Sequence, residues 1–132
     1  MNTTRILRTS LLGVAATAAL GLAAACGGGE ASAPSDETAV PSGATEFVVV
    51  MHDNTFEPAE FSIKQGQSVT IVAKNEGTAV HNLVVVGAGM ASDALVNPGA
   101  ESRFEVRFDR RTKFKIQCDY HLPEMVGEIT VR

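Results

Sequence analysis

From residue 46 onward, apolar and polar side chains alternate in short segments separated by turn-forming residues. A period of two places every second side chain on the same face of a β-strand. The seven segments are 46–51, 61–63, 69–73, 81–86, 104–108, 114–118 and 127–131. No stretch shows sustained helical periodicity, although the long gap at 87–100 leaves room for a turn of helix at 91–95. The pattern predicts an all-β, Greek-key β-sandwich forming one domain over 46–132.

The first 25 residues have the pattern of an export signal. Arg5 and Arg8 give a positive start, and an apolar run of 15 residues follows at 11–25. That run is shorter than the ~20 residues that cross a bilayer. Because it ends in three alanines, it has the length and ending of a cleaved signal. We therefore predict a signal peptide over 1–25.

Cys26 follows the alanines directly and resembles the lipidated cysteine of a bacterial lipobox. Leu22 lies four positions before Cys26 rather than the favoured three, so ordinary cleavage that releases a soluble protein stays open as an alternative. Residues 26–45 are mostly Gly, Ala, Ser, Pro and acidic residues without an apolar face, which predicts a flexible linker. We expect an exported protein, held by lipid at the outer face of the cytoplasmic membrane or otherwise periplasmic or extracellular.

The charge balance argues against nucleic acid and anionic lipid surfaces as partners. The chain has 15 acidic and 11 basic side chains, and two of the basic ones, Arg5 and Arg8, lie in the predicted signal. The remainder carries a net charge of −6. Nucleic-acid binding and attraction to anionic lipid both require an excess of positive charge. We expect neither.

Cys118 is the only cysteine apart from Cys26. Outside the cytoplasm most thiols form disulfides, so an unpaired cysteine there indicates reactivity or metal binding. His121 and Met125 follow it three and seven positions later, and His81 lies 37 positions upstream. One thiolate, two imidazoles and a thioether are the ligands of a type 1 copper site, with the thioether as a long axial ligand. Zinc also binds Cys and His, but its structural sites take a harder fourth ligand than Met.

This ligand set leaves no coordination position for a substrate or a water molecule, unlike a catalytic metal site. Thiolate and thioether suit Cu(I), while imidazole suits both oxidation states. The residues therefore predict a redox carrier that is not an enzyme.

Two segments resemble the small cupredoxins: Val-His-Asn-Leu-Val-Val at 80–85 and Cys-Asp-Tyr-His-Leu-Pro-Glu-Met-Val-Gly at 118–127. The plastocyanin and amicyanin branch and related bacterial lipoprotein cupredoxins are most similar, and the resemblance covers 46–132. It implies one copper held by four ligands, with the last of them axial: His81, Cys118, His121 and Met125. The three-residue spacing between the second histidine and the methionine varies between branches. The resemblance also implies that Asn82 ties the two ligand segments together near the sulfur.

Together with the signal-like segment and Cys26, the resemblance leads us to expect a membrane-anchored, monomeric protein that carries single electrons between a transient redox donor and acceptor. His121 would then be the ligand nearest solvent, with Leu122 and Pro123 as apolar surface around it. Two other functions stay open: delivery of copper itself to an oxidase or a resistance system, and a metal-free adhesion or ligand-binding sandwich. The remaining histidine, His52, is expected at the surface.

Overall fold

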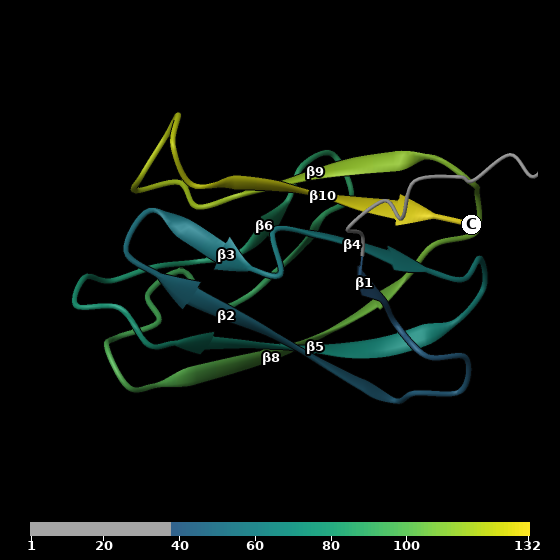
Figure 1. The fold of residues 1–132 in the computed structure, drawn as a ribbon, viewed down its shortest axis with the longest axis horizontal. Coiled ribbons are helices and arrows are strands. Elements are labelled where there is room, and N and C mark those ends of the chain that lie inside the picture. Colours follow the sequence, from purple (N-terminus) through teal and green to yellow (C-terminus); the bar gives the residue numbers. More distant parts are fainter. Residues whose placement is uncertain (1–37) are drawn as a thin grey trace, which may run out of the picture. The chain divides into compact units, whose positions relative to one another are not determined.

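The computed structural model describes residues 38–132. The predicted signal peptide (1–25), the lipidation site Cys26 and linker residues 27–37 lie outside the described residues. Between 38 and 132 the chain forms ten strands in two sheets (Figure 1), which confirms the all-β sandwich. No helix in this part of the chain is long and apolar enough to cross a membrane.

The larger sheet has the order β1-β4-β10-β9-β6-β7. Its strands are β1 (Thr38–Ala39), β4 (Glu60–Ile63), β10 (Val126–Val131), β9 (Lys113–Gln117), β6 (Val84–Val85) and β7 (Met90–Ala91). The smaller sheet has the order β3-β2-β5-β8. Its strands are β3 (Thr55–Glu57), β2 (Glu46–His52), β5 (Ser68–Asn75) and β8 (Glu101–Arg107).

Both sheets are mixed, because β4 runs parallel to β10 and β2 runs parallel to β5, while most other neighbours are antiparallel. The alternation read from the sequence places the core as predicted: Val69, Ile71 and Ala73 on β5 are all buried. Ile116 on β9 and Cys118 just beyond it are buried too, so the period of two points Cys118 inward. The rigid sheets thus fix the point at which the β9–β10 loop begins.

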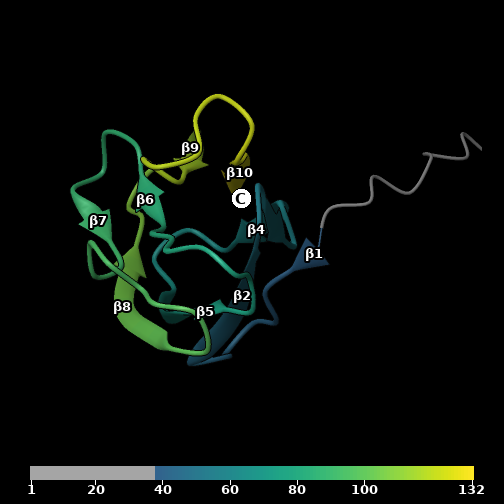
Figure 2. The same cartoon turned by 90° about the vertical axis from the view of Figure 1, so that its left-hand side faces the viewer.

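Three loops meet at one end of the sandwich, the end that faces the viewer in Figure 2. They are the β2–β3 turn, the β5–β6 segment and the β9–β10 loop, which leave strands of both sheets. Residues that are far apart in sequence are thereby brought together at this end.

The structure differs from the sequence-based expectation at three places. The predicted strand at 81–86 is reduced to β6, because His81 leaves the ladder and pairs with Val96 as an isolated bridge. The predicted turn of helix at 91–95 is wrong, since Met90 and Ala91 form β7 and pair with β6. Part of the predicted linker, residues 38–45, is ordered: β1 pairs with β4, and the apolar Val40 is buried in the core.

Candidate metal centre

The β9–β10 loop, residues 118–125, is closed by its own backbone. The Cys118 N–H donates to the Met125 carbonyl oxygen (3.0 Å), and the Met125 N–H donates to the His121 carbonyl oxygen (2.8 Å). The His121 N–H in turn donates to the Cys118 carbonyl oxygen (3.3 Å). These hydrogen bonds fix the backbone positions of Cys118, His121 and Met125 relative to one another. All three residues carry a candidate ligand atom.

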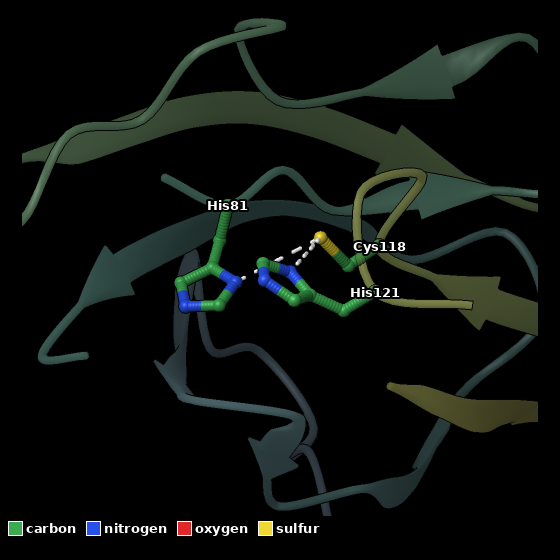
Figure 3. Close-up of side chains that lie close together, drawn as sticks. All are labelled: His81, Cys118 and His121. Carbon is green, nitrogen blue, oxygen red and sulfur yellow. Dashed lines mark hydrogen bonds between the residues drawn. The ribbon is translucent and has the colours of Figure 1, made fainter. Parts of the chain in front are cut away.

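His81 comes from the segment between β5 and β6. Its N–H donates to the Val96 carbonyl oxygen (3.1 Å), and the Val96 N–H donates back to the His81 carbonyl oxygen (2.9 Å). The His81 side chain is fully buried. Because both its backbone and its ring are enclosed, His81 is held facing the β9–β10 loop (Figure 3).

The structure brings His81, Cys118 and His121 together. The Cys118 Sγ lies 3.8 Å from His81 Nδ1 and 3.5 Å from His121 Nδ1, and the three ligand atoms all lie within 4.8 Å of one another (Figure 3). The two imidazole rings are 4.6 Å apart between centroids. Metal–sulfur and metal–nitrogen bonds of ~2.3 and ~2.0 Å put two ligands of one ion about 3.5 to 4 Å apart. The two sulfur–nitrogen distances therefore fit a single metal ion shared by the three side chains.

The candidate ligands differ in their access to solvent. His81, Cys118 and Met125 are fully buried, whereas the His121 side chain is half-buried. Around His121, the neighbouring side chains Tyr120 and Leu122 are exposed. His121 is thus the one member of this group through which the cluster reaches the surface.

Asn82 connects the two segments that carry the candidate ligands. Its side-chain Nδ2 donates to Asp119 Oδ2 (3.1 Å), and the Asp119 N–H donates to Asn82 Oδ1 (2.9 Å). Gln117 also donates to the Asp119 carboxylate, at 2.9 Å. The hydrogen bonds from Gln117 and then Asn82 hold the pKa of Asp119 below its ordinary value. The residues that follow His81 and Cys118 are therefore bound to each other directly.

Asp53, in the β2–β3 turn, contacts the far side of the His81 ring. Its Oδ1 lies 3.3 Å from His81 Nε2. Hydrogen bonds from the Thr78 hydroxyl and the Thr78 and Ala79 N–H groups place the pKa of Asp53 far below its ordinary value. Sequence analysis missed this residue, because it lies 28 positions before His81 and no spacing rule joins the two.

His52, adjacent to Asp53, lies at the surface with its side chain 38% exposed, and its Nε2 lies 3.1 Å from Glu57 Oε2. In the β2–β3 ladder, His52 lies opposite Thr55. Among residues 38–132, the one group of three or more His, Cys, Asp or Glu side chains that could hold a metal ion is that of His81, Cys118 and His121. His52 stands outside it.

A family model, described as a cupredoxin-like domain, matches residues 15–131. The chain belongs to this family. The family match and the cluster of ligand atoms together support one type 1 copper in this cupredoxin. A search of curated proteins gave no match.

Solved structures have the same fold. Auracyanin A, a "blue" copper protein of Chloroflexus aurantiacus, has a TM-score of 0.61 at 18% identity, over 68% of this chain and 100% of that one. The dithionite-reduced auracyanin of Roseiflexus castenholzii has a TM-score of 0.60 at 20% identity, over 67% and 97% of the two chains. The metal-binding domain of the Cu(I)-exporting ATPase CopA of Streptococcus pneumoniae reaches 0.60 at 11% identity, over 74% and 96%. At these identities the likeness establishes the fold of this cupredoxin.

Proposed function

We propose that this cupredoxin is a carrier of single electrons whose copper would be held by His81, Cys118 and His121, with the buried Met125 as the fourth ligand. The observation that carries the proposal is the burial of this set: three of the four side chains are inaccessible to solvent, and the fourth is half-buried. A site of this kind favours passing an electron over exchanging its metal or binding a substrate.

The chemistry of the ligands supports the same role. Copper bound by thiolate, imidazole and thioether supplies a one-electron couple in which soft sulfur ligands stabilise Cu(I) and imidazole suits both states. The chain contributes rigidity: Cys118 and Met125 are joined by a backbone hydrogen bond of 3.0 Å, and His81 is fixed by its bridge to Val96. Ligands that are held in place move little when the charge changes, and this keeps electron transfer fast.

His121 is the proposed point of electron entry and exit. It is the candidate ligand with access to solvent, and exposed Tyr120 and Leu122 lie on either side of it in the sequence. Redox partners form small, short-lived interfaces. We propose that a donor and an acceptor protein dock in turn on this surface and that the carrier acts as a monomer.

The proposed place of action is outside the cytoplasmic membrane. The signal-like segment 1–25 and Cys26 after three alanines support export and a lipid anchor. An anchored carrier would meet its partners near the membrane surface, within the distance that its linker allows. The alternative is ordinary cleavage of the signal segment, which would release a soluble protein.

Copper delivery remains the second candidate. One of the similar structures is a metal-binding domain of a Cu(I)-exporting ATPase, and another is a copper-binding protein solved in the apo form. A delivery protein must hand over its metal, so its ligands should be open to attack by those of the acceptor. The burial of His81, Cys118 and Met125 favours the electron carrier.

Voltammetry of the copper-loaded protein tests the proposal. We expect a reversible one-electron wave and rapid electron exchange with small redox proteins, both lost in Cys118→Ala. Glu124→Gln, a change of an exposed side chain in the same loop, is the matched control and should keep a reversible one-electron wave. Loss of copper on each reduction would overturn the electron-carrier proposal and favour delivery.

A further inference from the structure

We propose that Asp53 is a positioning residue for the copper site: its carboxylate holds His81 with Nδ1 free for the metal and lowers the reduction potential. This inference rests on the proposed copper site. It concerns a residue in the β2–β3 turn, outside both segments that carry the ligands.

The contact fixes which nitrogen of His81 carries the proton. Asp53 Oδ1 lies 3.3 Å from Nε2, and Nδ1 faces Cys118 Sγ at 3.8 Å. An ionised carboxylate only accepts hydrogen bonds, so Nε2 must be the donor. Nδ1 then keeps its lone pair. Metal-binding histidines commonly donate their second N–H to a carboxylate or carbonyl, which orients the ring and makes it a stronger ligand.

Asp53 is itself held firmly. Its Oδ1 accepts from the Thr78 N–H (2.8 Å) and the Ala79 N–H (3.2 Å), and its Oδ2 accepts from the Thr78 hydroxyl (2.7 Å). These donors belong to the segment that leads directly into His81. The carboxylate therefore joins the β2–β3 turn to the ligand and to the backbone that precedes it.

Gly77 makes room for this contact. A Cβ at position 77 would lie 2.5 Å from Asp53 Oδ1 and 2.9 Å from His81 Nε2. Both distances are shorter than non-bonded atoms tolerate, so a side chain at position 77 would force the carboxylate, the ring or the adjoining backbone to move. The absence of a side chain at Gly77 thus leaves the space that the Asp53–His81 contact occupies.

The charge of Asp53 has a consequence for the copper couple. A negative charge near the metal favours the oxidised, more positive state through Coulomb attraction. The Asp53 side chain is 43% exposed, so solvent weakens this effect without removing it. A neutral group at position 53 should therefore raise the reduction potential.

Two substitutions of Asp53 separate its two roles in the copper-loaded full-length protein. Asp53→Asn keeps an oxygen that can accept from His81 but removes the charge. At a fixed solution potential, it should shift the Cu(II)/Cu(I) ratio three- to tenfold toward Cu(I). This corresponds to a rise in the reduction potential of roughly 30 to 60 mV. Asp53→Ala also removes the acceptor, so His81 is no longer oriented. Its copper affinity should fall about 10- to 100-fold, as for other lost partners of metal-binding histidines.

Gly77→Ala tests the contact without changing any charge. It should raise the potential and weaken copper binding in the same direction as the Asp53 variants. Glu76→Gln is the matched control. It removes a carboxylate from the same segment, but that carboxylate pairs with Lys74 (2.6 Å) and not with His81. Glu76→Gln should leave both quantities nearly unchanged.

The outcomes separate this inference from the copper site on which it depends. A wild-type protein without a type 1 spectrum would overturn the proposed function and this inference with it. A type 1 wild type whose potential and copper affinity are unchanged in Asp53→Asn, Asp53→Ala and Gly77→Ala would overturn the role of Asp53 alone. Lower thermal stability without those shifts would mean that Asp53 merely caps the segment at Thr78. If Asp53→Ala fails to fold, the other two variants decide.

Discussion

Asn82 and Asp119 exchange two hydrogen bonds between the segments that carry the candidate copper ligands. The Asp119 N–H donates to Asn82 Oδ1 at 2.9 Å, and Asn82 Nδ2 donates to Asp119 Oδ2 at 3.1 Å. Each residue directly follows a candidate ligand, His81 or Cys118. The pair thus sets the relative position of two ligands without contributing a ligand atom.

Asn82→Ala should therefore loosen the site. It leaves the Asp119 N–H without its partner, and Asn82 is itself buried, so we expect a loss of about 1–3 kcal/mol in the free energy of unfolding. Copper affinity should fall about 10- to 100-fold. Denaturant unfolding and copper titration measure the two effects. Gln117→Ala is the control. It also removes a hydrogen bond to Asp119, but that bond lies within one segment and does not connect the two.

His121→Ala should abolish electron exchange with partner proteins. The substitution removes the half-buried candidate ligand and would leave copper without its partner at the surface, while the buried His81 and Cys118 remain. Stopped-flow mixing with a small redox protein measures the rate. Leu122→Ala, next in the loop, should only weaken docking. Full electron-transfer activity in His121→Ala would contradict the assignment of this residue.

Gly127→Ala should destabilise the end of the sandwich that holds the ligand loop. A Cβ at this position would overlap the Ala59 carbonyl oxygen and lie 3.0 Å from a carbon of Ile116, so β10 must move away from its neighbours. Forced overpacking costs about 1–3 kcal/mol. Thermal unfolding measures the loss, and an unchanged melting temperature would show that β10 accommodates the methyl group freely.

Copper should stabilise the folded domain and leave it slowly. A ligand that binds only the folded state adds about 2.7 kcal/mol at 100 times its Kd. Cys118→Ala should lose this increment. Because three of the proposed ligands are buried, a Cu(I) chelator should remove copper slowly from the wild type. Immediate transfer to the chelator would support copper delivery instead.

The sequence predicted the sandwich and its core through the period of two. That period also predicted an inward Cys118, because Phe114 and Ile116 precede it on the same face. The pattern failed at 81–86, where His81 pairs with Val96 instead of continuing a strand. It had no means of finding Asp53, since this contact arises where β2 and β5 end side by side in one sheet, with Met51 opposite Asn75, and local periodicity does not give the order of strands in a sheet.

The visible and electron paramagnetic resonance spectra of the purified protein with one equivalent of Cu(II) test the central claim most directly. We predict an intense thiolate-to-copper band and a narrow copper hyperfine splitting, both absent in Cys118→Ala. A pale spectrum of ordinary Cu(II), or no copper binding, would contradict a type 1 site formed by His81, Cys118 and His121.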